Sequence, residues 1–138
     1  MDRQPRCANG QISSTKNDKM KIKEGEIVII PELKFTHVMS EEWIDSDDFY
    51  ICLDAFVGEV NCEGTEVFRF HIVSPKRLLR VLEGSNEIEI GRGYLITTDY
   101  SHSKIEARLS TLLRNCGRTT WDDVIQAICR YGYWESET

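Results

Sequence analysis

Two neighbouring segments alternate between apolar and other side chains over eight residues each, and this pattern constrains the fold more than any other feature. In residues 50–57 and 66–73 the apolar residues of one face are Ile51, Leu53, Ala55, Val57, Phe68, Phe70 and Ile72. Because successive side chains of a strand point to opposite faces, each segment is predicted to be a β-strand with one buried face. The glycine-bounded residues 58–64 between them are predicted to form a hairpin loop.

The part of the chain before this pair lacks such alternation. Residues 26–30 (EIVII) form a short β-rich run that stops at Pro31, which predicts a short first strand. Residues 32–48 are predicted to form an acidic loop with a helical turn near 40–43. Residues 1–19 are polar and have no hydrophobic period, so they are predicted to be a flexible tail.

Three helices are expected after the strand pair. Ser74 and Pro75 have the pattern of an N-cap and a first helical residue, and Gly84 is expected to end this helix. Its apolar face is Leu78, Leu79 and Leu82, while Lys76, Arg77 and Arg80 are expected to point away. A second helix follows a capping box at 103–106, with the apolar stripe Ile105, Leu109, Leu112, Leu113 and Cys116, and ends at Gly117. A third follows a cap at Thr120, with the stripe Trp121, Val124, Ile125 and Ile128.

Residues 87–90 and 94–98 also have strand-like composition, interrupted by the glycines at 91 and 93. Whether they form one bent strand or a hairpin stays open. The resulting order is β-β-β-α-β-α-α. We therefore predict an α+β fold, with an antiparallel sheet of about four to five strands and helices packed on one face. Residues 20–138 are predicted to form this single domain.

Several classes of protein are disfavoured by composition. No apolar run approaches the ~18 residues that a membrane span needs, and no apolar stretch follows the basic residues of the first twenty, so no signal peptide is predicted. The five cysteines are an odd number without CxxC spacing, which argues against a disulfide framework and a structural zinc site. A cytoplasmic location is expected. The net charge of −6 makes direct binding to nucleic acid unfavourable.

The acidic residues are concentrated in one third of the chain. Residues 24–66 contain twelve acidic residues against Lys34 alone, whereas residues 67–138 have a net charge of +1. The densest cluster lies around one tryptophan and gives the candidate partner-binding residues Glu41, Glu42, Trp43, Asp45, Asp47 and Asp48. One interpretation is a solvated loop that promotes solubility. The other is a surface that attracts a basic partner and accelerates association with it.

The sharpest enzymatic hypothesis places Cys52 beside His71 on paired strands, with Asp54 to orient the imidazole. The simpler alternative is a cross-strand ion pair between Asp54 and Arg69. The three histidines have no ligand spacing that predicts a metal site, and the Gly-Arg-Gly at 91–93 is more typical of a turn than of a phosphate loop. No cofactor is predicted. The aromatic residues near the C-terminus are read as covering a helix end, with a partner anchor as the alternative.

Longer motifs in the second half carry a resemblance to a known family. They are SPKRLL at 74–79, GRGYLI at 91–96, DYSHSKIEARLSTLLRNC at 99–116 and TTWDDVIQAICRYGYWE at 119–135. Together with looser similarity from residue 20 onward, they resemble the immunity protein 8 (Imm8) family of bacterial immunity proteins. Members of this family are encoded beside polymorphic toxins, including effectors of contact-dependent growth inhibition.

The resemblance implies a protein that binds and neutralises a cognate toxin domain, encoded by an adjacent gene, in the cytoplasm of the producing cell. It supplies no catalytic residues. Many such toxins are nucleases with basic substrate sites, which suits an acidic inhibitor. The matching residues Pro75, Gly91, Arg92, Trp121 and Trp134 are interpreted as holding the fold. A small Cys/His-dependent hydrolase and an intracellular adaptor without a toxin remain the alternatives.

Overall fold

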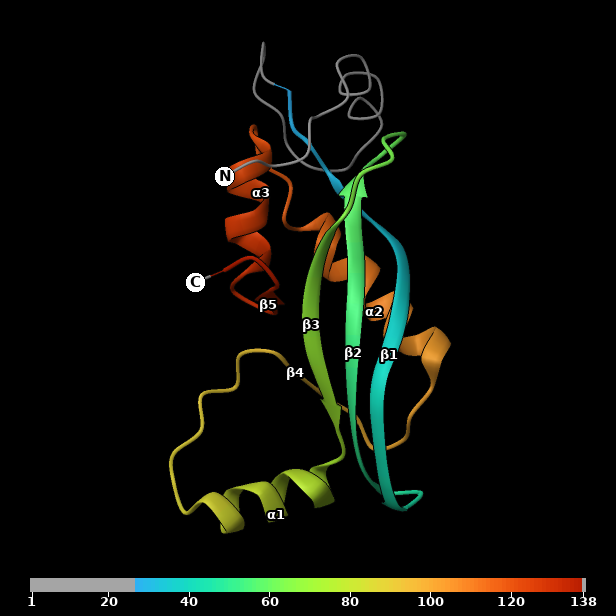
Figure 1. Ribbon diagram of the computed structural model, residues 1–138, viewed down its shortest axis with the longest axis vertical. Helices are drawn as coiled ribbons and strands as arrows, with labels where there is room; N and C mark the ends of the chain where they lie inside the picture. Colours follow the sequence, from blue (N-terminus) through green and yellow to red (C-terminus); the bar gives the residue numbers. More distant parts are fainter. Residues whose placement is uncertain (1–26, 138) are drawn as a thin grey trace.

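The computed structural model describes residues 27–137, which form a five-stranded sheet and three helices (Figure 1). The strands are β1 (Pro31–Asp45), β2 (Asp48–Glu59), β3 (Glu66–Val73), β4 (Tyr94–Ile96) and β5 (Tyr133–Trp134), and the helices are α1 (Pro75–Ser85), α2 (His102–Arg114) and α3 (Trp121–Ile128). The predicted α+β class is confirmed. The predicted tail at residues 1–19 lies outside the described residues. Within residues 27–137, no helix combines the length and the apolar character that a membrane span requires.

The strand pair predicted from alternation is present as β2 and β3. The two strands are antiparallel, and Leu53 lies opposite Phe70. All seven apolar residues of the predicted buried face expose 1% of their surface or less. Both strands have a neighbouring strand on each side, and their apolar side chains are buried against α2 and α3. Because only one face of the sheet is buried in this way, the alternation in the sequence identifies it.

The first strand differs from its prediction. Pro31 begins β1 instead of ending a strand, and residues predicted to be an acidic loop with a helical turn form a strand of 15 residues that pairs with β2. The sequence of β1 shows no regular alternation, for two reasons. The strand lies at an edge of the sheet with most side chains exposed, and its pairing shifts register at three places. A proline at the first position of an edge strand leaves no ladder hydrogen bond unmade.

The sheet is mixed, so the prediction of a purely antiparallel sheet is wrong. β4 pairs parallel to β3, and β5 pairs antiparallel to β3. A parallel neighbour needs a crossover connection, which α1 and the segment after it provide between β3 and β4. Residues 87–90, predicted to be strand-like, belong to this connection, and Ile88 and Ile90 expose 97% and 81% of their surface.

The core lies between the sheet and two of the helices. The predicted stripes of α2 and α3 are buried in one cluster with the inner faces of β2 and β3, and Trp121 is 5% exposed. Figure 1 shows α2 crossing behind β1 and β2. No described residue of α1 belongs to this cluster, and α1 lies at the far end of the sheet (Figure 1). Helix packing thus differs between α1 and the other two.

The helix starts follow the predicted capping chemistry, with one shift. The hydroxyls of Ser74 and Thr120 accept backbone N–H bonds from Arg77 and Asp123, as expected. α2 begins two residues earlier than predicted, because Ser101 is its cap. Among the cysteines in the described part, Cys52, Cys116 and Cys129 are free. Cys62 is disulfide-bonded, although the cysteine count and spacing argue against a disulfide framework.

Candidate partner-binding surface

The acidic cluster lies at the β1–β2 hairpin end, beside α1 (Figure 1). We call residues 41–48 the acidic hairpin. Its candidate residues Glu41, Glu42, Trp43, Asp45 and Asp47 are exposed, as expected. Asp48 is 4% exposed, which corrects the expectation of an exposed loop position. It begins β2 and lies under side chains of α1.

The strand geometry divides this cluster between the two faces of the sheet. Glu41 lies opposite Ile51 and Trp43 opposite Phe49, and both partners belong to the buried face. Glu42 lies opposite Tyr50 and therefore points to the other face. The consecutive acidic residues do not form one continuous surface.

Basic side chains of α1 neutralise the carboxylates on the face to which Glu42 points. The Arg77 guanidinium donates to Asp48 Oδ1 at 3.0 Å and to Glu42 Oε1 at 2.9 Å, and Arg80 donates to Asp48 Oδ1 at 2.9 Å. The hydrogen bond from Arg80, followed by that from Arg77, lowers the pKa of Asp48 despite the opposing effect of burial. Lys76 lies 3.6 Å from Asp47. Glu42, Asp47 and Asp48 thus have cationic partners within the chain.

This contact also corrects the predicted orientation of α1. Arg77 is 8% exposed instead of pointing to solvent, whereas Leu79 and Leu82, predicted to be buried, are 55% and 37% exposed. The helix turns its basic side toward the acidic hairpin. Hydrophobic periodicity alone could not predict this, because the buried partner of α1 is a carboxylate.

Asp45 lies opposite Asp48 and therefore points to the α1 side, whereas Glu41 lies beside Trp43 on the other face. The Trp43 ring lies 4.9 Å from Phe49 and 6.1 Å from Tyr100, and its Nε1 donates to Glu41 Oε1 at 2.9 Å. Burial raises the pKa of the Tyr100 hydroxyl, and the nearby charges of Glu41 and Glu106 add to this effect. We define the Trp43 patch as Glu41, Trp43, Ile44, Tyr100 and Glu106.

The Trp43 patch combines exposed apolar area with negative charge. Trp43 is 45% exposed and Ile44 is 62% exposed. An exposed tryptophan whose orientation is fixed by a hydrogen bond is a frequent anchor of protein interfaces. Sequence reasoning missed Ile44, Tyr100 and Glu106. The last two are far away in the sequence and join the patch only because α2 lies against β1.

The fold-holding candidates have different surroundings. Arg92 donates to Gly132 O at 2.9 Å and to Glu137 Oε1 at 2.6 Å, with its guanidinium 4.2 Å from the Tyr133 ring centre. Trp134 pairs with Phe68, and its Nε1 donates to Glu66. Trp134 and its neighbour thus form β5, whereas they were expected only to cover a helix end.

Pro75 occupies the first position of α1, as its pattern predicts. The glycine that the backbone requires is Gly93, not Gly91. Gly93 has a φ of +88°, and a Cβ there would lie 2.5 Å from the Tyr133 ring, whereas a Cβ at Gly91 would meet nothing within 4 Å.

Cys52 and His71, the alternative catalytic pair, are not arranged as an activated nucleophile and base. Cys52 and His71 lie opposite each other on β2 and β3, as predicted, but Asp54 forms a two-point ion pair with Arg69 at 2.8 and 3.1 Å. Burial raises the pKa of the Cys52 thiol and lowers that of the His71 imidazole, so neither the thiolate nor the imidazolium is favoured. His71 Nδ1 has no hydrogen-bond partner. Within residues 27–137 no group of side chains is arranged to hold a metal ion.

We therefore expect Cys52→Ala to keep the biological activity of the protein. Cys52 is half-buried and makes no hydrogen bond through its thiol, so unfolding in urea should shift by less than about 1.5 kcal/mol. The measurement compares growth protection and urea midpoints of wild type and variant. Loss of protection without loss of stability would restore the thiol hypothesis.

Comparison with known proteins decides the family. The sequence model of the family described as immunity protein 8 matches residues 30–138. The chain belongs to the immunity protein 8 family. The match covers all five strands and all three helices described above. Neither the comparison with curated proteins nor that with solved structures found a match. Membership of this family indicates a toxin-neutralising immunity function and a protein toxin as partner.

Proposed function

We propose that this immunity protein neutralises its toxin by binding alone, and that the Trp43 patch contacts a basic face of the toxin. The partner is a cognate toxin domain encoded by an adjacent gene, within a polymorphic toxin or contact-dependent growth inhibition system. Binding takes place in the cytoplasm of the producing cell. The observation that carries the proposal is an exposed tryptophan flanked by carboxylates in a chain of this family.

The charge of the patch supports a nuclease as the toxin. Nucleases bind phosphate through Lys and Arg, so their substrate sites are basic. Among the described residues Glu41 has no cationic partner, and Glu106 pairs only with His102, which carries charge only when protonated. Such carboxylates attract a basic surface over the screening length of ~8–10 Å.

The direct test mixes the purified protein with the purified toxin domain encoded by the neighbouring gene. Size-exclusion chromatography and calorimetry should give a one-to-one complex, with loss of toxin activity in proportion to complex formed. A toxin domain that neither binds nor loses activity would contradict the proposal.

The contribution of the patch can be measured by charge reversal. The double variant Glu41→Lys, Glu106→Lys should associate more slowly and show a weaker dependence of association rate on salt, because exposed charges act mainly during encounter. Each exposed pair contributes only ~0.2–1 kcal/mol, so dissociation should change less. Stopped-flow association across a range of ionic strength gives both values.

A matched variant separates the patch from net charge. Glu63→Lys with Glu135→Lys makes the same charge change at two exposed positions outside the acidic hairpin. It should keep most of the wild-type rate and salt dependence. Equal responses of the two double variants would mean that the Trp43 patch is not part of the interface.

A further inference from the structure

The edge of the sheet formed by β4 has a free side. The strand order is β1-β2-β3-β4, and β5 pairs with β3, so within residues 27–137 no strand lies beyond β4. β1 is the other edge, and it carries charges and register shifts, which are common protections of a sheet edge. β4 has neither over its three residues.

The backbone of β4 presents hydrogen-bonding groups outward. His71 N–H donates to Gly93 O at 2.7 Å, and Thr97 N–H donates to Val73 O at 3.1 Å. Alternate residues of a parallel strand bond to the same neighbour, so Gly93, Leu95 and Thr97 face β3. The N–H and C=O of Ile96 therefore face away from β3.

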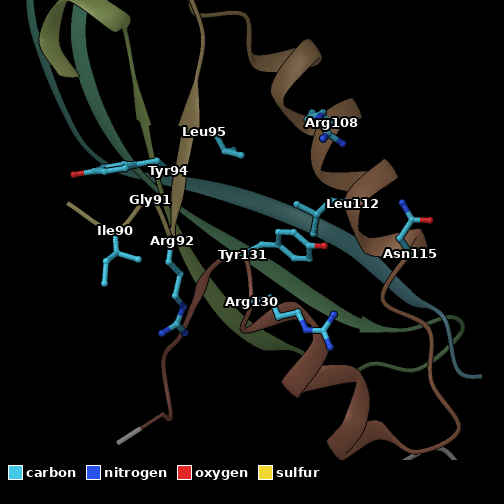
Figure 2. A pocket seen from close by; sticks show the side chains of 10 residues that line it. All are labelled: Ile90, Gly91, Arg92, Tyr94, Leu95, Arg108, Leu112, Asn115, Arg130 and Tyr131. Atoms are coloured by element: carbon cyan, nitrogen blue, oxygen red, sulfur yellow. The ribbon is translucent and has the colours of Figure 1, made fainter. Parts of the chain in front are cut away.

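A groove runs along this outward side, between β4 and α2. It consists of two cavities of about 470 and 410 Å³ that share Tyr94, Leu95 and Arg108 as lining residues. Figure 2 shows the side chains of Leu95, Leu112 and Tyr131 pointing into the space between β4 and α2. The groove thus offers apolar contact next to an unpaired backbone.

The rim of the groove is basic. Arg108 and Lys104 extend from α2, and Arg130 follows α3. None of the three has a carboxylate partner among the described residues, and the single acidic lining residue is Asp99, in the second cavity. Arg92 also lines the first cavity, but its guanidinium is bound to Glu137.

We propose that an extended segment of the cognate toxin binds in this groove as an additional strand beside β4, with acidic side chains directed at Arg108 and Arg130. This inference rests on the proposed function and adds a second contact surface to it. Main-chain hydrogen bonds to an exposed edge supply affinity, and flanking pockets select side chains. The charge of the rim is opposite to that of the Trp43 patch.

The same charges argue against a second copy of this chain as the occupant. Pairing of two β4 edges around a two-fold axis places identical surfaces against each other. Arg108, Arg130 and Lys104 of one copy would then approach those of the other. A partner segment that carries carboxylates avoids this repulsion.

Two pairs of variants test the groove with the neighbouring gene's toxin domain as the probe. Ile96→Pro removes the outward N–H of β4, whereas Ile96→Ala keeps this N–H and only shortens the side chain. A proline is tolerated on an edge strand where the lost N–H bonds no neighbouring strand. We expect at least tenfold weaker binding for Ile96→Pro and less than threefold for Ile96→Ala. Arg108→Glu should weaken binding at least tenfold, whereas Arg114→Glu, on the same helix but outside both cavities, should not.

Hydrogen exchange of the wild-type protein gives a readout that does not depend on how variants fold. The peptide containing residues 94–97 should exchange at least tenfold more slowly in the complex. Unchanged exchange in this peptide, or equal binding by all four variants, would contradict the proposal that the toxin binds in the groove. If a one-to-one complex still forms, the proposed function remains. If wild type does not bind the toxin domain at all, both proposals fall.

Discussion

Replacing Trp121 by alanine should lower the free energy of unfolding by about 3–5 kcal/mol, a large part of the stability of a domain of this size. The side chain is 5% exposed and begins the buried stripe of α3 in the same cluster as the inner face of β2 and β3. Truncation leaves a cavity that the surrounding helix and sheet can fill only partly. Urea unfolding followed by circular dichroism measures the change.

Trp43→Ala is the matched control for this variant. The Trp43 side chain is 45% exposed and lies on the edge strand β1, so its loss should change stability by less than about 1.5 kcal/mol. In binding the order should reverse, with Trp43→Ala weakening the complex. An unchanged urea midpoint for Trp121→Ala would contradict the place of this residue in the core.

Gly93→Ala should destabilise the protein by about 2–4 kcal/mol, from backbone strain and overpacking together. Gly93 has a φ of +88°, a region that side chains with a Cβ rarely adopt, and the added carbon would lie 2.5 Å from the Tyr133 ring. Tyr133 also carries the Arg92 guanidinium, so a shift of its ring would disturb that contact as well. Thermal or urea unfolding reports the loss.

Gly91→Ala provides the comparison. Its added Cβ would meet nothing within 4 Å, so the substitution should be neutral or stabilise by up to about 1 kcal/mol through the unfolded state. The motif alone made Gly91 the fold-holding glycine, whereas the geometry transfers that role to Gly93. Equal losses for the two variants would contradict this assignment.

Prediction of the fold succeeded where periodicity reports burial directly. β2 and β3, and the stripes of α2 and α3, are packed against one core, so their apolar spacing is regular. β1 is an edge strand with three register shifts, and no regular spacing remains in its sequence. The pairing partners of β4 and β5 are set by the path of the chain, which local sequence does not encode.

The candidate surface was only partly predictable for a related reason. The charge count located the acidic hairpin. Its acidic residues were expected to form one surface, because the sequence shows no strand alternation there. That alternation directs Glu42 toward Arg77 and leaves Glu41 beside Trp43. Tyr100 and Glu106 join the Trp43 patch through tertiary packing, which no local pattern in the sequence reveals.

The central claim is that protection results from binding without turnover, and a titration of toxin activity tests it most directly. A fixed amount of the toxin domain is mixed with increasing amounts of this protein, well above the dissociation constant, and the remaining activity is measured. We predict a linear loss that reaches zero at one molecule of this protein per toxin. Complete inactivation by much less than one equivalent, progressing with time, would show that the protein acts as a catalyst and would contradict the account.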